Sequence, residues 1–181
     1  RHGRASFAWE PGTGVKKEEE VEKVIISGVT HDTSEAKVTV VGVPDRPGIA
    51  ARLFRALADE AVNVDMIEQN VSVHGLADIS FTFPKADLAV ATRITEQIAG
   101  ELGAERVEPD ADIARISLIG AGMKTHPGVA ATMFETLAAE GLNIEMISTS
   151  PIRISCVVRA SEVEKGVRAL HAAFDLENGH A

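Results

Sequence analysis

The chain contains the same structural unit twice. Residues 47–70 (PGIAARLFRALADEAVNVDMIEQN) and 127–150 (PGVAATMFETLAAEGLNIEMISTS) align without a gap at an offset of 80, and 11 of the 24 positions are identical. Each copy has a Pro-Gly loop, an amphipathic helix pattern and an alternating strand pattern that begins at an asparagine. A single supersecondary unit therefore occurs twice, and its parts are more typical of a small-ligand sensor than of a catalyst.

The hydrophobic periodicity of the first copy predicts the order β-α-β-β-α-β, the ferredoxin-like split unit. Pro47 suits the first turn of its first helix, where the missing N–H would be unbonded in any case. Gly75 lies where two alternating strands are expected to join in a hairpin. The predicted elements are a strand at 38–43, a helix at 47–61, strands at 62–66 and 79–83, a helix at 88–102 and a strand at 105–108.

The second copy shows the same course but lacks its last strand. Its predicted elements are a strand at 113–119, a helix at 127–140, strands at 142–148 and 152–158, and a helix at 161–174. Residues 175–181 are too few and too polar for a fourth strand, and a sheet edge would stay uncovered without one. The segment 21–30 is the unassigned strand candidate, so we predict that it completes the second sheet. The expected fold is α+β: one domain at 38–109 is inserted within another at 21–31 plus 113–176.

Composition and spacing exclude several classes of function. The net charge of −9, from 18 basic and 27 acidic residues, opposes association with nucleic acid or an anionic membrane. The single cysteine, Cys156, excludes a disulfide framework and a Cys-His metal site, so we expect no metal. Apolar stretches are too short for a membrane span or a signal peptide, and we expect a cytoplasmic protein. No catalytic signature is present, and we expect no catalytic activity from this chain.

Residues 1–20 (RHGRASFAWEPGTGVKKEEE) differ from the rest of the chain. They show no lasting period and end in a charge run, which is typical of a linker or of the edge of a neighbouring domain. The chain does not begin with methionine. We interpret it as the C-terminal part of something longer, or as a processed or tagged product.

Five strings of the chain carry a family resemblance. They are SEAKVTVVGVPDRPG (34–48), NVDMIEQNVS (63–72), DISFTF (78–83), ISLIGAGMKTHPGVAATMFETLA (116–138) and NIEMISTSPIRISCVV (143–158). These strings resemble the paired ACT domains at the C-terminus of aspartokinase, most closely the lysine- and threonine-sensitive actinobacterial type. The resemblance covers nearly the whole chain, and RASFAWEPGTGV at 4–15 resembles the linker that leaves the kinase domain. In that family the regulatory half is also made separately as a β subunit, and an N-terminal strand completes the second ACT unit.

The chemistry of the Pro-Gly loop agrees with an amino-acid ligand. A helix N-terminus offers unpaired N–H groups to a carboxylate, and Gly48 and Gly128 let the backbone approach closely. Asp45 can accept a hydrogen bond from an ammonium group, while Asn63 and Asn143 offer side-chain amides. About three such charge-assisted bonds, each contributing roughly 1.5–3 kcal/mol, would hold a small zwitterion at micromolar to millimolar strength.

The resemblance implies effector sites between the strand-to-helix loop of one unit and a strand and loop of a dimer partner. It also implies feedback inhibition by lysine, threonine or both, acting on an attached or associated kinase domain that makes 4-phosphoaspartate. No cofactor is expected in this chain, since ATP and Mg²⁺ would belong to that kinase domain. The implied effector residues are Asp45, Gly48, Ile49, Ala50, Asn63, Val64, Gln69 and Asn70 in the first unit and His126, Pro127, Gly128, Val129, Asn143, Ile144, Ser148 and Thr149 in the second.

Other interpretations stay open at this point. The chain could be a ferredoxin-like dimerisation or assembly module, or an ACT sensor attached to a different enzyme. His126 fits a loop or cap residue better than a catalytic group, and the Asp-x-Pro-Gly sequence at 45–48 is also a common turn. Cys156, Phe54 and Phe134 fit core positions. The two Pro-Gly loops differ in charge and by two inserted residues, so they need not bind the same effector.

Overall fold

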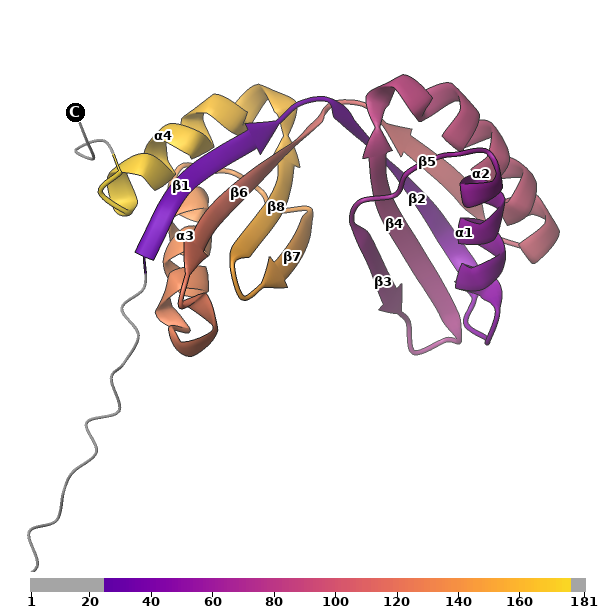
Figure 1. Ribbon diagram of the computed structural model, residues 1–181. Helices are drawn as coiled ribbons and strands as arrows, with labels where there is room; N and C mark the ends of the chain where they lie inside the picture. The colour runs from indigo at the N-terminus through magenta and orange to yellow at the C-terminus, as the bar shows by residue number, and fades with distance from the viewer. Residues whose placement is uncertain (1–24, 177–181) are drawn as a thin grey trace, which may run out of the picture.

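Each copy of the repeat folds into a four-stranded antiparallel sheet with two helices against one face. The computed structural model describes residues 25–176 (Figure 1). In the first unit the strand order is β3-β4-β2-β5, which is the ferredoxin-like arrangement. Its elements are β2 (Glu35–Pro44), α1 (Ile49–Asp59), β3 (Ile67–Val71), β4 (Leu76–Pro84), α2 (Leu88–Leu102) and β5 (Arg106–Asp110).

The second unit takes its fourth strand from the beginning of the described chain. That strand, β1, pairs antiparallel with β6, and Val29 lies opposite Leu118. The sheet order is β1-β6-β8-β7, so the chain leaves the second unit after β1 and returns to it at β6. The prediction of two ferredoxin-like units, the first inserted within the second, is confirmed. The elements are β1 (Ile25–Asp32), β6 (Ile113–Ala121), α3 (Gly128–Ala139), β7 (Met146–Ser150), β8 (Arg153–Arg159) and α4 (Val163–Ala173).

Among the described residues, short 3₁₀ turns precede three of the four helices, and α1 is the exception. They are η1 (Lys85–Asp87), η2 (Met123–Thr125) and η3 (Ala160–Glu162). The predicted linker at 1–20 and residues 21–24 of the predicted strand lie outside the described residues. Within residues 25–176 no helix combines the length and the apolar character that a membrane crossing requires.

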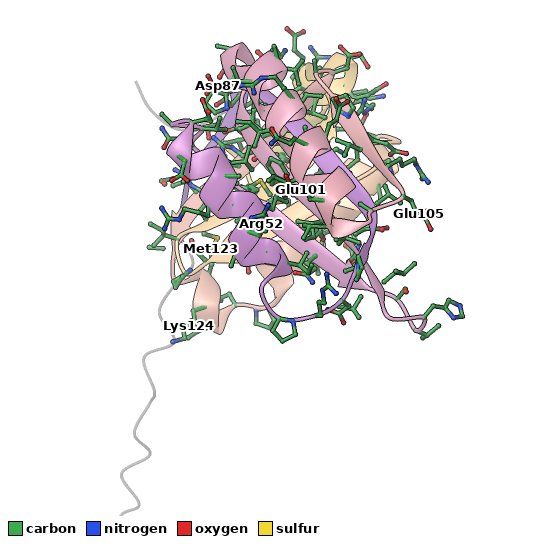
Figure 2. All side chains as sticks on the ribbon, turned by 90° about the vertical axis from the view of Figure 1, so that its right-hand side faces the viewer. Arg52, Asp87, Glu101, Glu105, Met123 and Lys124 are labelled. Atoms are coloured by element: carbon green, nitrogen blue, oxygen red, sulfur yellow. The ribbon has the colours of Figure 1, made fainter. Side chains whose placement is uncertain are left out.

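Each unit has its own hydrophobic core between its sheet and its helices. In the first unit Phe81 is fully buried and contacts the ring of Phe54 edge-on at 5.3 Å between centroids. In the second unit Met133 and Leu137 of α3 are fully buried. An ion pair between Arg52 and Glu101 joins α1 to α2 on the outer surface (Figure 2). Burial of these two cores therefore stabilises the units separately.

A third, smaller apolar cluster lies where the two units meet. It consists of Met66, Ile113, Met146 and Val157, all buried. Figure 1 shows the helices on the outer sides of an arch, with the helix-free faces of the two sheets turned toward each other. The small cluster joins Met66 of the first unit to residues of the second, so the two units pack against one another there.

The predicted strands at 62–66 and 142–148 begin later than expected. The observed strands start at Ile67 and Met146. The backbone N–H of Val62 donates to the carbonyl of Leu57, and that of Leu142 donates to Leu137, each at 3.0 Å. These bonds close the helix C-terminus in a Schellman-type turn, so the first residues after each helix complete the helix instead of pairing in the sheet.

Two further predictions were wrong. Pro47 does not lie in the first helical turn, because the left-handed backbone of Gly48 (φ 93°) separates it from α1. Phe54 and Phe134 are half-buried at the edges of their cores, not within them. The prediction for Cys156 is confirmed: its side chain is fully buried, and burial raises the pKa of its thiol to about 12.

Candidate functional site

The first Pro-Gly loop presents an uncapped helix N-terminus. Gly48 precedes α1, its carbonyl accepts the N–H of Arg52 at 3.0 Å, and no side chain caps the helix. The N–H groups of the first helical turn thus have no intrahelical partner. The N–H of Asp45 donates to the carbonyl of Gly75 at 2.9 Å. This bond holds the loop beside the β3–β4 hairpin.

The polar side chains predicted for the first site are all exposed. Asp45, Asn63, Gln69 and Asn70 form no side-chain hydrogen bond or ion pair with any residue in the described range 25–176. Their donors and acceptors are therefore available to a ligand or to a second chain. The apolar members differ: Ile49 is buried, Ala50 is exposed and Val64 is half-buried against the core.

The predicted residues of the first site do not gather around one cavity. Asn70 lines a shallow groove of about 230 Å³, whose lining includes Ser72, Asp78 and Glu105. The Pro-Gly loop and Asn63 are not part of that lining. Within the described chain the Pro-Gly loop and Asn70 of the edge strand β3 therefore lie in separate places.

The second Pro-Gly loop is built differently. The two inserted residues fall in the turn η2. In this turn the side chain of Met123 is buried in the second core, whereas that of Lys124 is exposed. Both residues are labelled in Figure 2. The ring Nδ1 of His126 lies 2.8 Å from the carbonyl of Gly122. His126 consequently fastens the loop, which agrees with its interpretation as a loop residue.

The other predicted residues of the second site lie around this loop and along β7. Pro127 caps α3, Gly128 is its first residue and Val129 is buried. Asn143, Ser148 and Thr149 are exposed, and Ile144 packs against the second core. The aligned loops therefore offer different donors to a ligand, as their charges and lengths led us to expect.

The two aligned glycines are expected to respond oppositely to alanine. Gly48 has φ 93°, which L-residues avoid, so Gly48→Ala should lower the free energy of unfolding by about 1–2 kcal/mol. Gly128 lies in the helix with open space at its Cβ position, so Gly128→Ala should be neutral or stabilising by up to about 1 kcal/mol. Urea unfolding followed by circular dichroism measures both. Equal losses would show that the backbone conformations of the two loops do not differ.

Charged residues that the sequence analysis did not select form a network where the units meet. Glu145 accepts hydrogen bonds from Lys37 at 2.9 Å and from Arg159 at 2.8 Å, and Arg159 also bonds Asp110. Burial alone would raise the pKa of Glu145, but the bonds from Arg159 and Lys37 outweigh it and lower that pKa. Conversely, the bonds to Glu145 and Asp110 raise the pKa of the Arg159 guanidinium.

A second set of charges surrounds Arg115 of β6. Its guanidinium pairs with Asp32, with Glu35 and with Asp65, residues of β1, β2 and the loop before β3. Burial raises the pKa of Glu35 despite the lowering effect of Arg115. The repeat could have indicated these residues, because both copies have a basic residue at the position of Lys37 and Arg115. Both copies also have an acidic residue at the position of Asp65 and Glu145.

Comparison with known proteins identifies the two units. One ACT domain model matches residues 37–103 and another matches residues 116–174. The chain is 50% identical to the aspartokinase of Mycobacterium tuberculosis over 180 residues, which cover 97% of this chain and 43% of that protein. It thus spans less than half the length of that curated relative.

Two solved structures of regulatory subunits match the chain over nearly their whole length. The ligand-free regulatory subunit of aspartate kinase from Thermus thermophilus is 40% identical, with a TM-score of 0.79, and the match covers 82% of this chain and 98% of that one. A structure of aspartokinase alpha and beta subunits gives the same identity and TM-score, with 83% of this chain and 99% of that one covered.

Proposed function

This chain belongs to the aspartokinase family, as its regulatory region of two ACT domains, and on that premise we propose that it binds lysine, threonine or both. Regulation of this type couples an amino-acid site to a distant reaction centre. The ligand must bind one arrangement of the ACT pair more tightly than another, since otherwise it shifts no equilibrium. Such coupling is typically worth about 1–3 kcal/mol, or roughly a five- to 150-fold change in affinity.

The observation that carries the proposal is the uncapped N-terminus of α1 beside the unpaired carboxylate of Asp45. An α-amino acid carries its carboxylate and its ammonium group on the same α-carbon. The free N–H groups of the first helical turn suit the carboxylate, and Asp45 suits the ammonium group. Gly48, Asn63, Gln69 and Asn70 complete the proposed first site, together with the backbone of Ile49, Ala50 and Val64.

A second copy of the chain would bring a Pro-Gly loop and an edge strand together in each proposed site. The edge strands β3 and β7 carry exposed apolar side chains, including Ile67 (56% exposed), Val71 (61%) and Ile147 (44%). Edge strands of this kind are suited to pairing with another chain. We therefore propose a homodimer in which edge strands from one copy face Pro-Gly loops from the other. The second site would use His126, Pro127, Gly128, Val129, Asn143, Ile144, Ser148 and Thr149.

The partner of the regulatory region would be an aspartokinase catalytic domain or alpha subunit. That part would bind ATP and Mg²⁺ and transfer phosphate to aspartate in the cytoplasm. Lysine and threonine would then act as end products that inhibit the first step of their own synthesis.

Asp45→Ala is expected to weaken the response to the effector without unfolding the first unit. In the unaltered chain, an amino acid at 100 times its Kd adds about 2.7 kcal/mol to stability, which raises the thermal midpoint by several degrees. Loss of one charge-assisted bond of about 1.5–3 kcal/mol should lower the affinity about tenfold or more. Thermal unfolding with lysine and threonine, singly and together, measures both effects.

Asp59→Ala is the matched control, because Asp59 is an exposed carboxylate of the same unit whose ion pair with Arg55 is also exposed. It should leave the midpoint shift unchanged. If neither amino acid moves the midpoint of the unaltered chain, the assignment of effectors is wrong. A large loss of stability in Asp45→Ala with unchanged affinity would show that Asp45 serves only the turn.

A further inference from the structure

The ion pairs between the two units are related by the repeat itself. Lys37 of β2 lies 2.9 Å from Glu145, which precedes β7 of the other unit. Arg115 of β6 pairs with Asp65, which precedes β3 of the first unit. Lys37 aligns with Arg115 at the offset of 78 that relates Gly42 to Gly120, and Asp65 aligns with Glu145 at the offset of 80. Each unit thus contributes a basic residue, from β2 or from β6, that pairs with the equivalent acidic residue of the other unit.

The acids lie at the same point of their respective sheets. The backbone N–H of Asp65 donates to the carbonyl of Thr82 at 2.9 Å, and that of Glu145 donates to Val157 at 2.8 Å. Thr82 is the register partner of Lys37, and Val157 is the register partner of Arg115. Each acid is consequently held twice, by its own sheet through the backbone and by the other unit through the side chain.

Met66 and Met146 follow these acids and are buried together with Ile113 and Val157. The crossed ion pairs therefore flank a small apolar cluster between the units. The side chains of Lys37, Glu145 and Arg115 are 13%, 17% and 17% exposed, whereas that of Asp65 is 45% exposed. Solvent screens the Lys37–Glu145 pair least, so it is the better of the two for a test.

We infer that the two crossed ion pairs, Lys37–Glu145 and Arg115–Asp65, form a clamp. Through this clamp each unit positions the loop of the other unit that carries proposed ligand residues. The inference rests on the proposed function, because the loops at 62–66 and 142–146 carry the proposed ligand residues Asn63 and Asn143. Lys37 lies on β2, which ends at Pro44 and leads directly into the first Pro-Gly loop. A change in the loop at 142–146 therefore acts, through Glu145 and Lys37, on the strand that leads to the first site.

Lys37→Met tests the clamp with little other damage. Glu145 keeps its two hydrogen bonds from Arg159, at 2.8 Å each, so its partly buried carboxylate stays paired. Loss of a partly buried pair worth about 1 kcal/mol should make the backbone amide of Glu145 exchange with deuterium about fivefold faster. The amide of Asp65, in the other loop, should keep its rate, and amides of the second core, whose opening also breaks the pair, should accelerate by no more than the same factor.

Two further variants separate the charge from general packing. Lys37→Arg retains the cation and should restore the slow exchange of the Glu145 amide. Lys85→Met removes an exposed lysine of the same unit and should have no effect. Unchanged exchange in Lys37→Met, or equal acceleration in Lys37→Met and Lys37→Arg, would overturn the clamp.

Measurements of amino-acid binding then test whether the clamp affects the affinity of the second site. In an Asp45→Ala background, which weakens the first site, Lys37→Met should weaken binding of lysine or threonine at the second site about fivefold, as measured by calorimetry. Faster exchange with unchanged affinity would overturn the positioning role. If the unaltered chain binds neither amino acid, the proposed function fails, while the exchange experiment still decides whether the clamp exists.

Discussion

Phe81→Ala is expected to lower the free energy of unfolding of the first unit by about 3–5 kcal/mol. Phe81 is fully buried at the middle of β4 and is among the largest side chains of the first core. It contacts Phe54 edge-on and lies 5.8 Å from the ring of Phe83. Removing a buried aromatic ring loses its transfer free energy, leaves a cavity and breaks both ring contacts. A loss of this size approaches the whole stability of a small domain.

The second unit provides a matched control at the same place in its sheet. Phe81 is the register partner of Val38, and Cys156 is the register partner of Ile116, which aligns with Val38 at the offset of 78. Cys156→Ala removes only a sulfur atom and should cost about 1 kcal/mol. Urea unfolding followed by circular dichroism should show an early transition for the first unit in Phe81→Ala alone. A single transition at the original midpoint would contradict the separate cores.

The insertion of one unit within the other could be predicted because the repeat made a missing element visible. The first copy has six predicted elements, while the second has five and a sheet edge without cover. A β-branched run at 21–30 was the unused candidate, and β1 at Ile25–Asp32 occupies that edge. Without the duplication, nothing in the local sequence of β1 would have linked it to a strand almost 90 residues later.

The errors in the fold arose where tertiary and terminal geometry overrides the alternation of apolar residues. Val62 and Met66 are both buried, as an alternating strand would have them. However, the N–H of Met66 donates to the side-chain hydroxyl of Thr82 at 3.0 Å, not to a ladder carbonyl. The helices end in left-handed residues at Ala61 (φ 57°) and Gly141 (φ 79°). The first residues of each predicted strand therefore belong to the turn that ends the helix. The alternation of apolar residues therefore indicated correctly which side chains are buried. It did not show that these residues pair in a sheet, because residues outside a regular strand can be buried in the same alternating pattern.

The difference between the two Pro-Gly loops could be predicted from the sequence, but their backbone geometry could not. The structure confirms that the loops differ, since Gly48 has a left-handed backbone and Gly128 is helical. It does not test which residues bind an effector, and that part stays a proposal. The crossed ion pairs were missed because each joins positions about 50 or 108 residues apart, and single-sequence patterns relate only near neighbours. In the sequence, these ion pairs were indicated by the charged residues that align between the two copies of the repeat.

Arg115→Met is expected to lower the free energy of unfolding by about 2–3 kcal/mol at neutral pH. Arg115 is the cation shared by Asp32, Glu35 and Asp65, and the side chain of Glu35 is only 10% exposed. Removing Arg115 leaves the buried carboxylate of Glu35 without a compensating cation, which costs more than the net contribution of the pair. The Oε2 atom of Glu35 already has no hydrogen-bond partner, so its carboxylate depends on Arg115.

The loss in Arg115→Met should also depend on pH in a definite direction. Burial raises the folded-state pKa of Glu35, and removal of Arg115 should raise it further. A group with a raised folded pKa favours the folded state below its unfolded pKa of about 4.3, and that contribution is lost as pH rises through the folded value. The variant should therefore be destabilised more at pH 8 than at pH 5, as urea unfolding at the two values would measure. Adding Glu35→Gln removes the unpaired carboxylate and should abolish this difference. If the difference persists in the double variant, Glu35 is not its source, and the charge balance at the junction rests on the other carboxylates.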